Sequence, residues 1–196
     1  ASRGLGDVYK RQLIDYESGN LHSALKAFEK ISSENSLGSV TITNDPEIIS
    51  NADRLVLPGD GAFPACKAAL EKSEVFEALK HAVLAKRRPF LGICVGMQLM
   101  ARKGFEFEQT NGLNWINGQV ERIQLDDPSL KIPHMGWNEI AIDYDHAILK
   151  DIKNGDHFYF VHSYQMRVFS HEERLAHVDY GGCLLYTSPS PRDATL

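Results

Sequence analysis

The stretch PFLGICVGMQL, Pro89–Leu99, decides the fold of this chain. Its apolar first half is typical of a strand buried on both faces of a parallel sheet, and its second half resumes as a helical pattern. Cys94 lies at the change, with Gly92 and Gly96 two residues away on each side. A strand that ends in Gly-x-Cys-x-Gly and runs into a helix is the thiol version of the nucleophile elbow, whose strained turn needs small flanking residues. The pattern predicts a nucleophilic Cys94; a buried cysteine at a strand end is the structural alternative.

The expected position of Cys94 also suits the chemistry of a thiolate. A helix N-terminus favours the ionised thiol and presents backbone N–H groups to a developing oxyanion. Cys66, in the helical segment FPACKAAL, has no such setting and is expected to be structural.

Strand and helix patterns alternate on both sides of this stretch. Strands are expected at 13–16, 40–43 and 54–59, and helices are expected to open at 18–20 and 45–46 and to cover about 64–71 and 73–85. After Gly112 the pattern changes to alternating strands at 118–125, 136–142, 157–168 and 174–180. No repeat or linker is visible, so the sequence predicts one α/β domain with a mostly parallel sheet and an added antiparallel strand region.

Composition excludes several classes of function. The 196 residues are 43% hydrophobic and 24% charged, with a net charge of −5. This charge does not favour binding to nucleic acid or to an anionic membrane surface. No apolar run reaches the roughly 18 residues of a membrane span. The three cysteines are far apart and no metal-ligand spacing occurs, so we expect a reducing, cytoplasmic setting with no metal and no cofactor.

The two ends are expected to be foreign to the fold. Back-translation of SRGLGDVYKRQ, residues 2–12, gives a DNA whose complementary strand, read in another frame, encodes CLLYTSPSPR, residues 183–192. Both ends therefore look like one adaptor DNA read inward from each side, and such scars are left out of fold reasoning. We expect the natural segment to be 13–182, flanked by non-native tails at 1–12 and 183–196.

Five segments carry a specific resemblance: LIDYESGNLHSALKAFE, LVLPGDGAF, PFLGICVGMQLM, KIPHMGWNEI and YFVHSY. In this order they resemble the glutaminase subunit of imidazole glycerol phosphate synthase, a class I glutamine amidotransferase of histidine biosynthesis. The resemblance implies the flavodoxin/Rossmann-like α/β fold of that class. Two positions depart from the common family pattern: Glu17 replaces a glycine, and Asp60 replaces a valine in the loop that supplies one oxyanion-hole N–H.

The resemblance also implies a mechanism. Cys94 attacks the side-chain amide of glutamine, backbone N–H groups of Val95 and the Gly59-Asp60 loop hold the oxyanion, and water then cleaves the thioester to glutamate. Gln98 contacts the substrate, with a solvent-facing helix position as the alternative, and the backbone at Ser163 and Tyr164 grips its amino-acid end. The activities implied are those of a hydrolase and a lyase.

The implied partner is a cyclase subunit with a TIM-barrel fold, which receives the ammonia in a heterodimer. The implied docking surface is the segment Pro133, His134, Met135, Gly136, Trp137 and Asn138. Without the resemblance, Trp137 would be placed in the core more readily than in an interface.

The proton acceptor for Cys94 is not evident. Family members carry a Phe-His-Pro-Glu segment near the C-terminus, and no such segment occurs among the eight histidines of this chain. His171 and Glu173 have the right spacing but fall in a charged turn, expected to be a solvated loop, and His134 and His162 fall in segments with interface and pocket-wall roles. We therefore expect the triad His and Glu to be missing after Gly182 and the chain as given to be inactive.

Two other functions stay open. Another class I amidotransferase, such as the glutaminase of pyridoxal phosphate synthesis, would share the Cys94 turn, although KIPHMGWN argues against it. The second open function is that of an amidotransferase-like module that binds a partner without catalysis.

Overall fold

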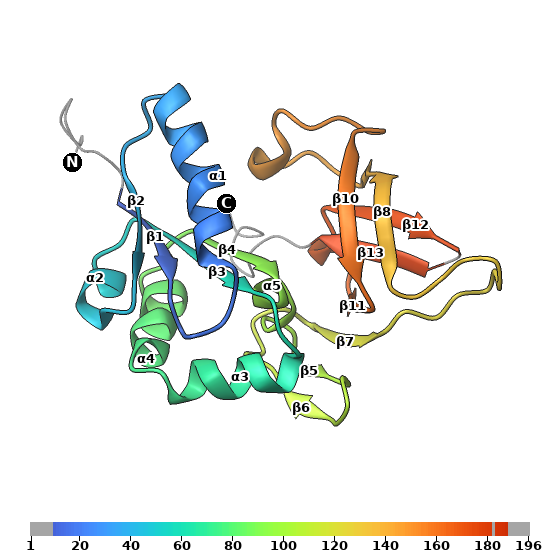
Figure 1. Cartoon of the computed structure of the whole chain (residues 1–196), viewed down its shortest axis with the longest axis horizontal. Helices are drawn as coiled ribbons and strands as arrows, with labels where there is room; N and C mark the ends of the chain where they lie inside the picture. The colour runs from blue at the N-terminus through green and yellow to red at the C-terminus, as the bar shows by residue number, and fades with distance from the viewer. Residues whose placement is uncertain (1–9, 182, 188–196) are drawn as a thin grey trace. The chain divides into compact units, whose positions relative to one another are not determined.

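The computed structural model describes residues 10–181 and 183–187, the last five by their backbone only (Figure 1). The chain divides between Leu99 and Met100 into two compact units. The division arises because the strands after Gly112 hydrogen-bond among themselves and form no ladder with the parallel sheet.

The first unit is built on a four-stranded sheet in the order β2-β1-β3-β4, with every pair parallel. Its strands are β1 (Arg11–Ile14), β2 (Val40–Thr43), β3 (Arg54–Gly59) and β4 (Phe90–Cys94). This order is that of flavodoxin-like sheets, in which ligands bind outside the carboxyl ends of the strands. The predicted α/β class with a parallel sheet is confirmed.

Helices connect these strands, as parallel pairing requires. They are α1 (Leu21–Glu34), α2 (Pro46–Ser50), α3 (Phe63–Lys72), α4 (Val75–Lys80) and the π-helical turn η1 (His81–Ala85), and α5 (Val95–Gln98) follows β4. The side chains of Asn20 and Asp45 accept hydrogen bonds from the first N–H groups of α1 and α2, so the predicted starts of both helices are confirmed. Leu25 and Phe28 of α1 pack on one face of the sheet.

The second unit is mainly antiparallel. One sheet has the order β11-β7-β5-β6, β10 pairs with β8, and β12 lies between β13 and β9. The bounds are β5 (Lys103–Gly104), β6 (Thr110–Asn111), β7 (Gly118–Arg122), β8 (His134–Glu139), β9 (Ala141–Ile142), β10 (His157–His162), β11 (Tyr164–Val168), β12 (Ala176–Tyr180) and β13 (Cys183–Thr187), with 3-10 turns η2 (Ala147–Leu149) and η3 (His171–Glu173). The predicted strand 157–168 is thus two strands, because the chain changes pairing partner at Ser163.

Residues 11–12 and 183–187, which the sequence assigns to the non-native tails, belong to strands of the structure. Arg11 and Gln12 pair with both β2 and β3, and residues 183–187 pair with β12. Ladder hydrogen bonds use the backbone alone, so an extended segment can pair in a sheet whatever the origin of its sequence. The rest of the predicted tails, 1–9 and 188–196, lies outside the described residues.

Within the described part of the chain, no helix has the length and apolar character that crossing a bilayer requires.

Candidate active site

Cys94 sits on a strained turn at the carboxyl end of β4. Its φ of 55° and ψ of −119° are unusual for a residue with a side chain, and α5 begins at the next residue. Its side chain is exposed, although it ends a strand of the central sheet. The strand–turn–helix geometry expected from Gly-x-Cys-x-Gly is therefore present, and the alternative of a buried structural thiol does not fit.

The glycines around Cys94 leave no room for a side chain. A Cβ at Gly96 would lie 1.8 Å from the carbonyl oxygen of Leu57, and one at Gly92 would lie 2.5 Å from the backbone of Met97. A Cβ at Gly59 would approach the backbone nitrogen of Gly96 to 2.9 Å. The backbone of the turn is thus packed against the ends of β3 and β4.

The helix after the elbow is a single turn. α5 consists of four residues, Val95–Gln98, and ends at Leu99. One turn has a much smaller macrodipole than a full helix, so the expected stabilisation of a thiolate by the helix dipole is weaker, and local N–H groups matter more. Gln98 is 7% exposed, so the solvent-facing alternative for it is wrong.

The loop after β3 lies beside the elbow. Gly59 is the register partner of Cys94 in the β3–β4 ladder, so the Gly59–Gly61 loop and the start of α5 emerge next to each other. Val95 and Gly59 are buried, whereas Asp60 is exposed. The structure therefore brings together, in one unit, five residues of the predicted site: Cys94, Val95, Gln98, Gly59 and Asp60.

Ser163 and Tyr164 belong to the second unit and form the junction between β10 and β11. The carbonyl oxygen of Ser163 accepts a hydrogen bond from the Ile123 N–H at 3.0 Å, and that of Tyr164 lies 2.9 Å from Nδ1 of His162. Internal bonds thus fix this backbone segment. Its contact with glutamine stays a prediction.

The rings of buried His134 and half-buried His162 are in contact. Nδ1 of His134 lies 3.1 Å from Nε2 of His162, whose other nitrogen faces the Tyr164 carbonyl, so each ring donates one hydrogen bond in a single consistent pair of tautomers. Burial, and then the neighbouring His162, lower the pKa of His134 to about 4, and burial also lowers the pKa of His162. Phe160 and Tyr180 stack on the His134 ring.

The predicted docking segment splits between the two faces of β8. Met135 and Trp137 are 60% and 69% exposed, so the core interpretation of Trp137 is wrong. His134 is 2% exposed, so its ring is not available at a docking surface, because strand residues alternate between faces. Pro133 is exposed, whereas Gly136 and Asn138 are half-buried.

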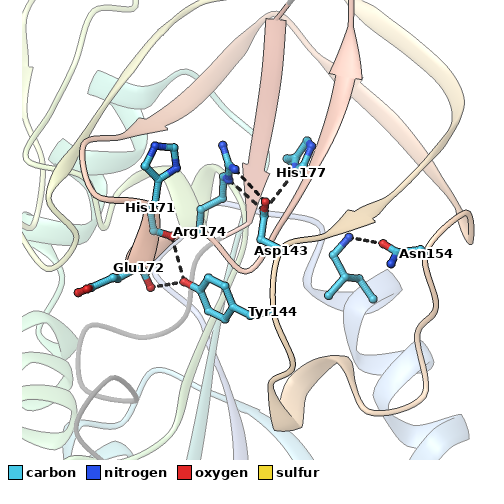
Figure 2. A network of polar contacts seen from close by, with 8 residues as sticks. Asp143, Tyr144, Asn154, His171, Glu172, Arg174 and His177 are labelled. Carbon is cyan, nitrogen blue, oxygen red and sulfur yellow. Dashed lines mark hydrogen bonds and ion pairs between the residues drawn. The ribbon is translucent and has the colours of Figure 1, made fainter.

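A polar network that sequence reasoning missed lies around Asp143. Figure 2 shows Arg174 and His177 directed at its carboxylate, at distances of 2.8–2.9 Å and 3.0 Å. Partial burial acts to raise the pKa of Asp143, but the hydrogen bonds from His177 and Arg174 lower it below its usual value. The Tyr144 hydroxyl donates to the backbone of residues 171–172 nearby. No spacing signal links these residues, because they come from separate elements.

The 171–173 turn lies nearby. His171 is exposed as expected, whereas Glu173 is half-buried and its carboxylate accepts a hydrogen bond from the N–H of Asn117 at 3.2 Å. His22 and His81 are exposed on helical segments of the first unit. Among the residues that the structure describes, no group of three or more His, Cys, Asp or Glu is placed to hold a metal ion.

A cysteine on a strained elbow at the carboxyl edge of a parallel sheet, with a glycine loop beside it, defines an α/β protein built for nucleophilic thiol chemistry. Residues 12–183 match the family described as glutamine amidotransferase class-I. The chain is 57% identical over 171 residues to the imidazole glycerol phosphate synthase subunit HisH of Ruegeria pomeroyi, covering 87% of this chain and 81% of that protein. It is 55% identical over 170 residues to the HisH subunit of Cereibacter sphaeroides, covering 86% and 80%. The chain belongs to the class-I glutamine amidotransferases, in the group of HisH subunits.

Solved structures agree on the fold. A crystal structure of a glutamine amidotransferase has a TM-score of 0.62 at 14% identity and covers 92% of this chain and 89% of its own. A glutamine amidotransferase from Thermotoga maritima has a TM-score of 0.56 at 16% identity, covering 92% and 75%. At these identities the likeness extends to the fold alone.

Proposed function

We propose that this chain is a glutaminase subunit that attacks glutamine through Cys94 and passes the ammonia to a cyclase subunit in histidine biosynthesis. The observation that carries the proposal is the conformation of Cys94, which presents an exposed sulfur beside two backbone loops at the carboxyl edge of the sheet. The match to the glutamine amidotransferase class-I family supports glutamine as the substrate, and relatives that are more than half identical and are named as subunits of imidazole glycerol phosphate synthase support a role as a subunit of that synthase.

The chemistry begins with attack by the Cys94 thiolate on the side-chain carbonyl carbon of glutamine. A sulfur–carbon bond forms, and the carbonyl electron pair moves to oxygen, where N–H groups of Val95 and the Gly59-Asp60 loop stabilise the charge. When the oxyanion collapses, the carbon–nitrogen bond breaks and the nitrogen leaves as ammonia after taking up a proton. Water then cleaves the thioester to glutamate. Gln98, one turn beyond the sulfur, would hold the substrate.

The proton transfers limit what the chain as given can do. General acid–base help contributes roughly 10²- to 10⁴-fold, and glutamine hydrolysis needs it to expel ammonia and to activate water. Nδ1 of His134 already faces Nε2 of His162, whose Nδ1 faces the Tyr164 carbonyl, and His177 is held by Asp143. We propose that this chain carries out the attack by Cys94 but does not turn over, and that tails of adaptor origin flank its natural segment.

An exposed aromatic face on β8 and β10 supports a protein partner. In the antiparallel register Trp137 faces Tyr159 and Met135 faces Val161, and all four side chains are more than half exposed. The rings of Trp137 and Tyr159 meet edge to face at 5.6 Å. Contiguous apolar surface of this kind marks interaction sites, and Trp, Tyr and Met are enriched in them. We propose that this face docks on the cyclase barrel.

The ring-forming lyase step then belongs to the partner, so lyase activity is not a property of this chain. The proposed location is the cytoplasm, in keeping with the biosynthetic names of the relatives.

A second function is favoured by the same aromatic face: a module that binds the partner without catalysis. Reaction with the γ-chloromethyl ketone analogue of glutamine separates the two, since a functional nucleophile displaces chloride and gains a covalent adduct. The wild-type chain and Cys66→Ser should form the adduct, and Cys94→Ser should not. A wild-type chain without an adduct, but with intact binding to the cyclase, would favour the binding module.

A further inference from the structure

The side chain of Asp60 ties the loop after β3 to the turn before α1. Its Oδ1 accepts a hydrogen bond from the backbone N–H of Gly19 at 3.0 Å. Asp60 is exposed and follows Gly59, the register partner of Cys94. The bond therefore joins the loop beside the nucleophile to a segment forty-one residues earlier in the chain.

The turn that supplies this N–H is itself fixed at both ends. The N–H of Asp15 donates to Thr43 of β2 at 2.9 Å, and Oδ1 of Asp15 accepts from the N–H of Glu17 at 3.0 Å. On the other side, Asn20 caps α1 through the Ser23 N–H. The donor at Gly19 is thus held between a central strand and a capped helix, so the tether has a rigid anchor.

Gly19 also allows the turn to lie directly on the loop. Its φ of +106° is a conformation that favours glycine, and a Cβ there would lie 3.2–3.3 Å from the backbone of Pro58 and Gly59. Beneath the loop, the Tyr16 hydroxyl lies 2.8 Å from the place of a Cβ at Gly59, and burial raises the pKa of this hydroxyl, which keeps it neutral. The loop is packed from below and tethered from the side by one hydrogen bond.

We propose that the Asp60 carboxylate is a positioning residue that holds the Gly59–Gly61 backbone in place for the oxyanion, a role that rests on the proposed glutaminase chemistry. The same bond directs the negative charge of Asp60 toward Gly19. The side chain, and not only the N–H, of Asp60 thereby contributes to the reactivity of Cys94 toward a carbonyl substrate.

Two substitutions separate the tether from the charge. Asp60→Val keeps a similar bulk but removes the acceptor, whereas Asp60→Asn keeps an acceptor oxygen and removes the charge. Asp127→Val is the matched control, because Asp127 is another exposed carboxylate that accepts a backbone N–H, from Ser129 at 2.8 Å, in the second unit. Circular dichroism and unfolding midpoints check that each variant is folded.

The readout is the inactivation of Cys94 by the γ-chloromethyl ketone analogue of glutamine, with its rate constant kinact and its half-saturation KI measured separately. The sulfur forms a bond to the chloromethyl carbon and chloride leaves with the bonding pair, while the ketone oxygen occupies the oxyanion position. Iodoacetamide alkylates the same thiol by direct displacement without a ketone to polarise. The ratio of the two rates therefore reports on the loop and not on the thiol.

Removing a hydrogen-bond donor to the oxyanion lowers the rate of the chemical step about 10²- to 10³-fold, and displacing such a donor lowers it less. Asp60→Val should therefore lower kinact about tenfold, with KI and the iodoacetamide rate unchanged. Asp60→Asn should keep at least the wild-type kinact, and Asp127→Val should match the wild type. Equal kinact for Asp60→Val and wild type, equal losses in both Asp60 variants, or a parallel loss with iodoacetamide would overturn the inference. A wild-type chain that does not react with the ketone overturns the glutaminase proposal itself, and the tether role with it.

Discussion

Substituting Gly96 by alanine should disrupt the elbow more than any other single methyl group near Cys94. The added Cβ would lie 1.8 Å from the Leu57 carbonyl oxygen, and ordinary contact begins at 3.4 Å, so the two backbones must separate by about 1.6 Å. Leu57 is fully buried in β3, between β1 and β4, and cannot move away alone. We expect the free energy of unfolding to fall by about 3 kcal/mol, at the upper end of overpacking costs.

The same displacement should reduce the reactivity of Cys94. A misplacement near 1 Å in an active site can cost about 10²-fold, so ketone labelling of Gly96→Ala should slow by that order. Urea unfolding gives the stability and the labelling rate gives the reactivity. The control for stability is Gly61→Ala, because its Cβ would lie 3.0 Å from the Cys66 sulfur, which is the end of a side chain and can shift. This substitution should lower the free energy of unfolding by about 1 kcal/mol or less. If Gly96→Ala kept nearly wild-type stability and labelling rate, the inference that the backbone at Gly96 packs directly against Leu57 would be wrong.

Three further outcomes are expected. Trp137→Ala and Met135→Ala should each weaken binding to the cyclase by about 1–3 kcal/mol in titration calorimetry, and unchanged affinity with lowered thermal stability would reject the aromatic face as an interface. The free energy of unfolding should decrease as the pH falls from 6.5 toward 4, because the pKa of His134 is about 4 in the folded chain and near 6.5 in the unfolded chain. In urea titrations at several pH values, His134→Phe should make this decrease smaller. An unchanged decrease would show that another group causes the pH dependence. The chain with added cyclase should release no ammonia from glutamine above background, and sustained release that His162→Gln or His171→Gln abolishes would identify that histidine as the base.

The sequence was informative wherever one local pattern had one physical cause. Gly92 and Gly96 around Cys94 predicted the elbow because a strained turn excludes side chains, and Asp45-Pro46 predicted a helix start because capping is local. The length of α5 was not predictable, since the apolar residues after Gln98 continue a helical pattern although the chain turns away at Leu99.

Contacts between distant segments were beyond the sequence. The bond from Gly19 to Asp60, the neutral pair of His134 and His162, and the Asp143 network each join residues from separate elements, which no spacing rule connects. The exposure of Trp137 depended on which face of β8 packs inward, and an alternating pattern does not decide that by itself.

The central claim is that Cys94 is a glutamine-directed nucleophile, and competition during labelling tests it most directly. The ketone analogue should modify one peptide, containing Cys94, and glutamine should slow the reaction in a saturable manner while asparagine, one methylene shorter, should not. Labelling that maps to Cys66, or labelling of Cys94 that glutamine and asparagine affect equally, would contradict the account.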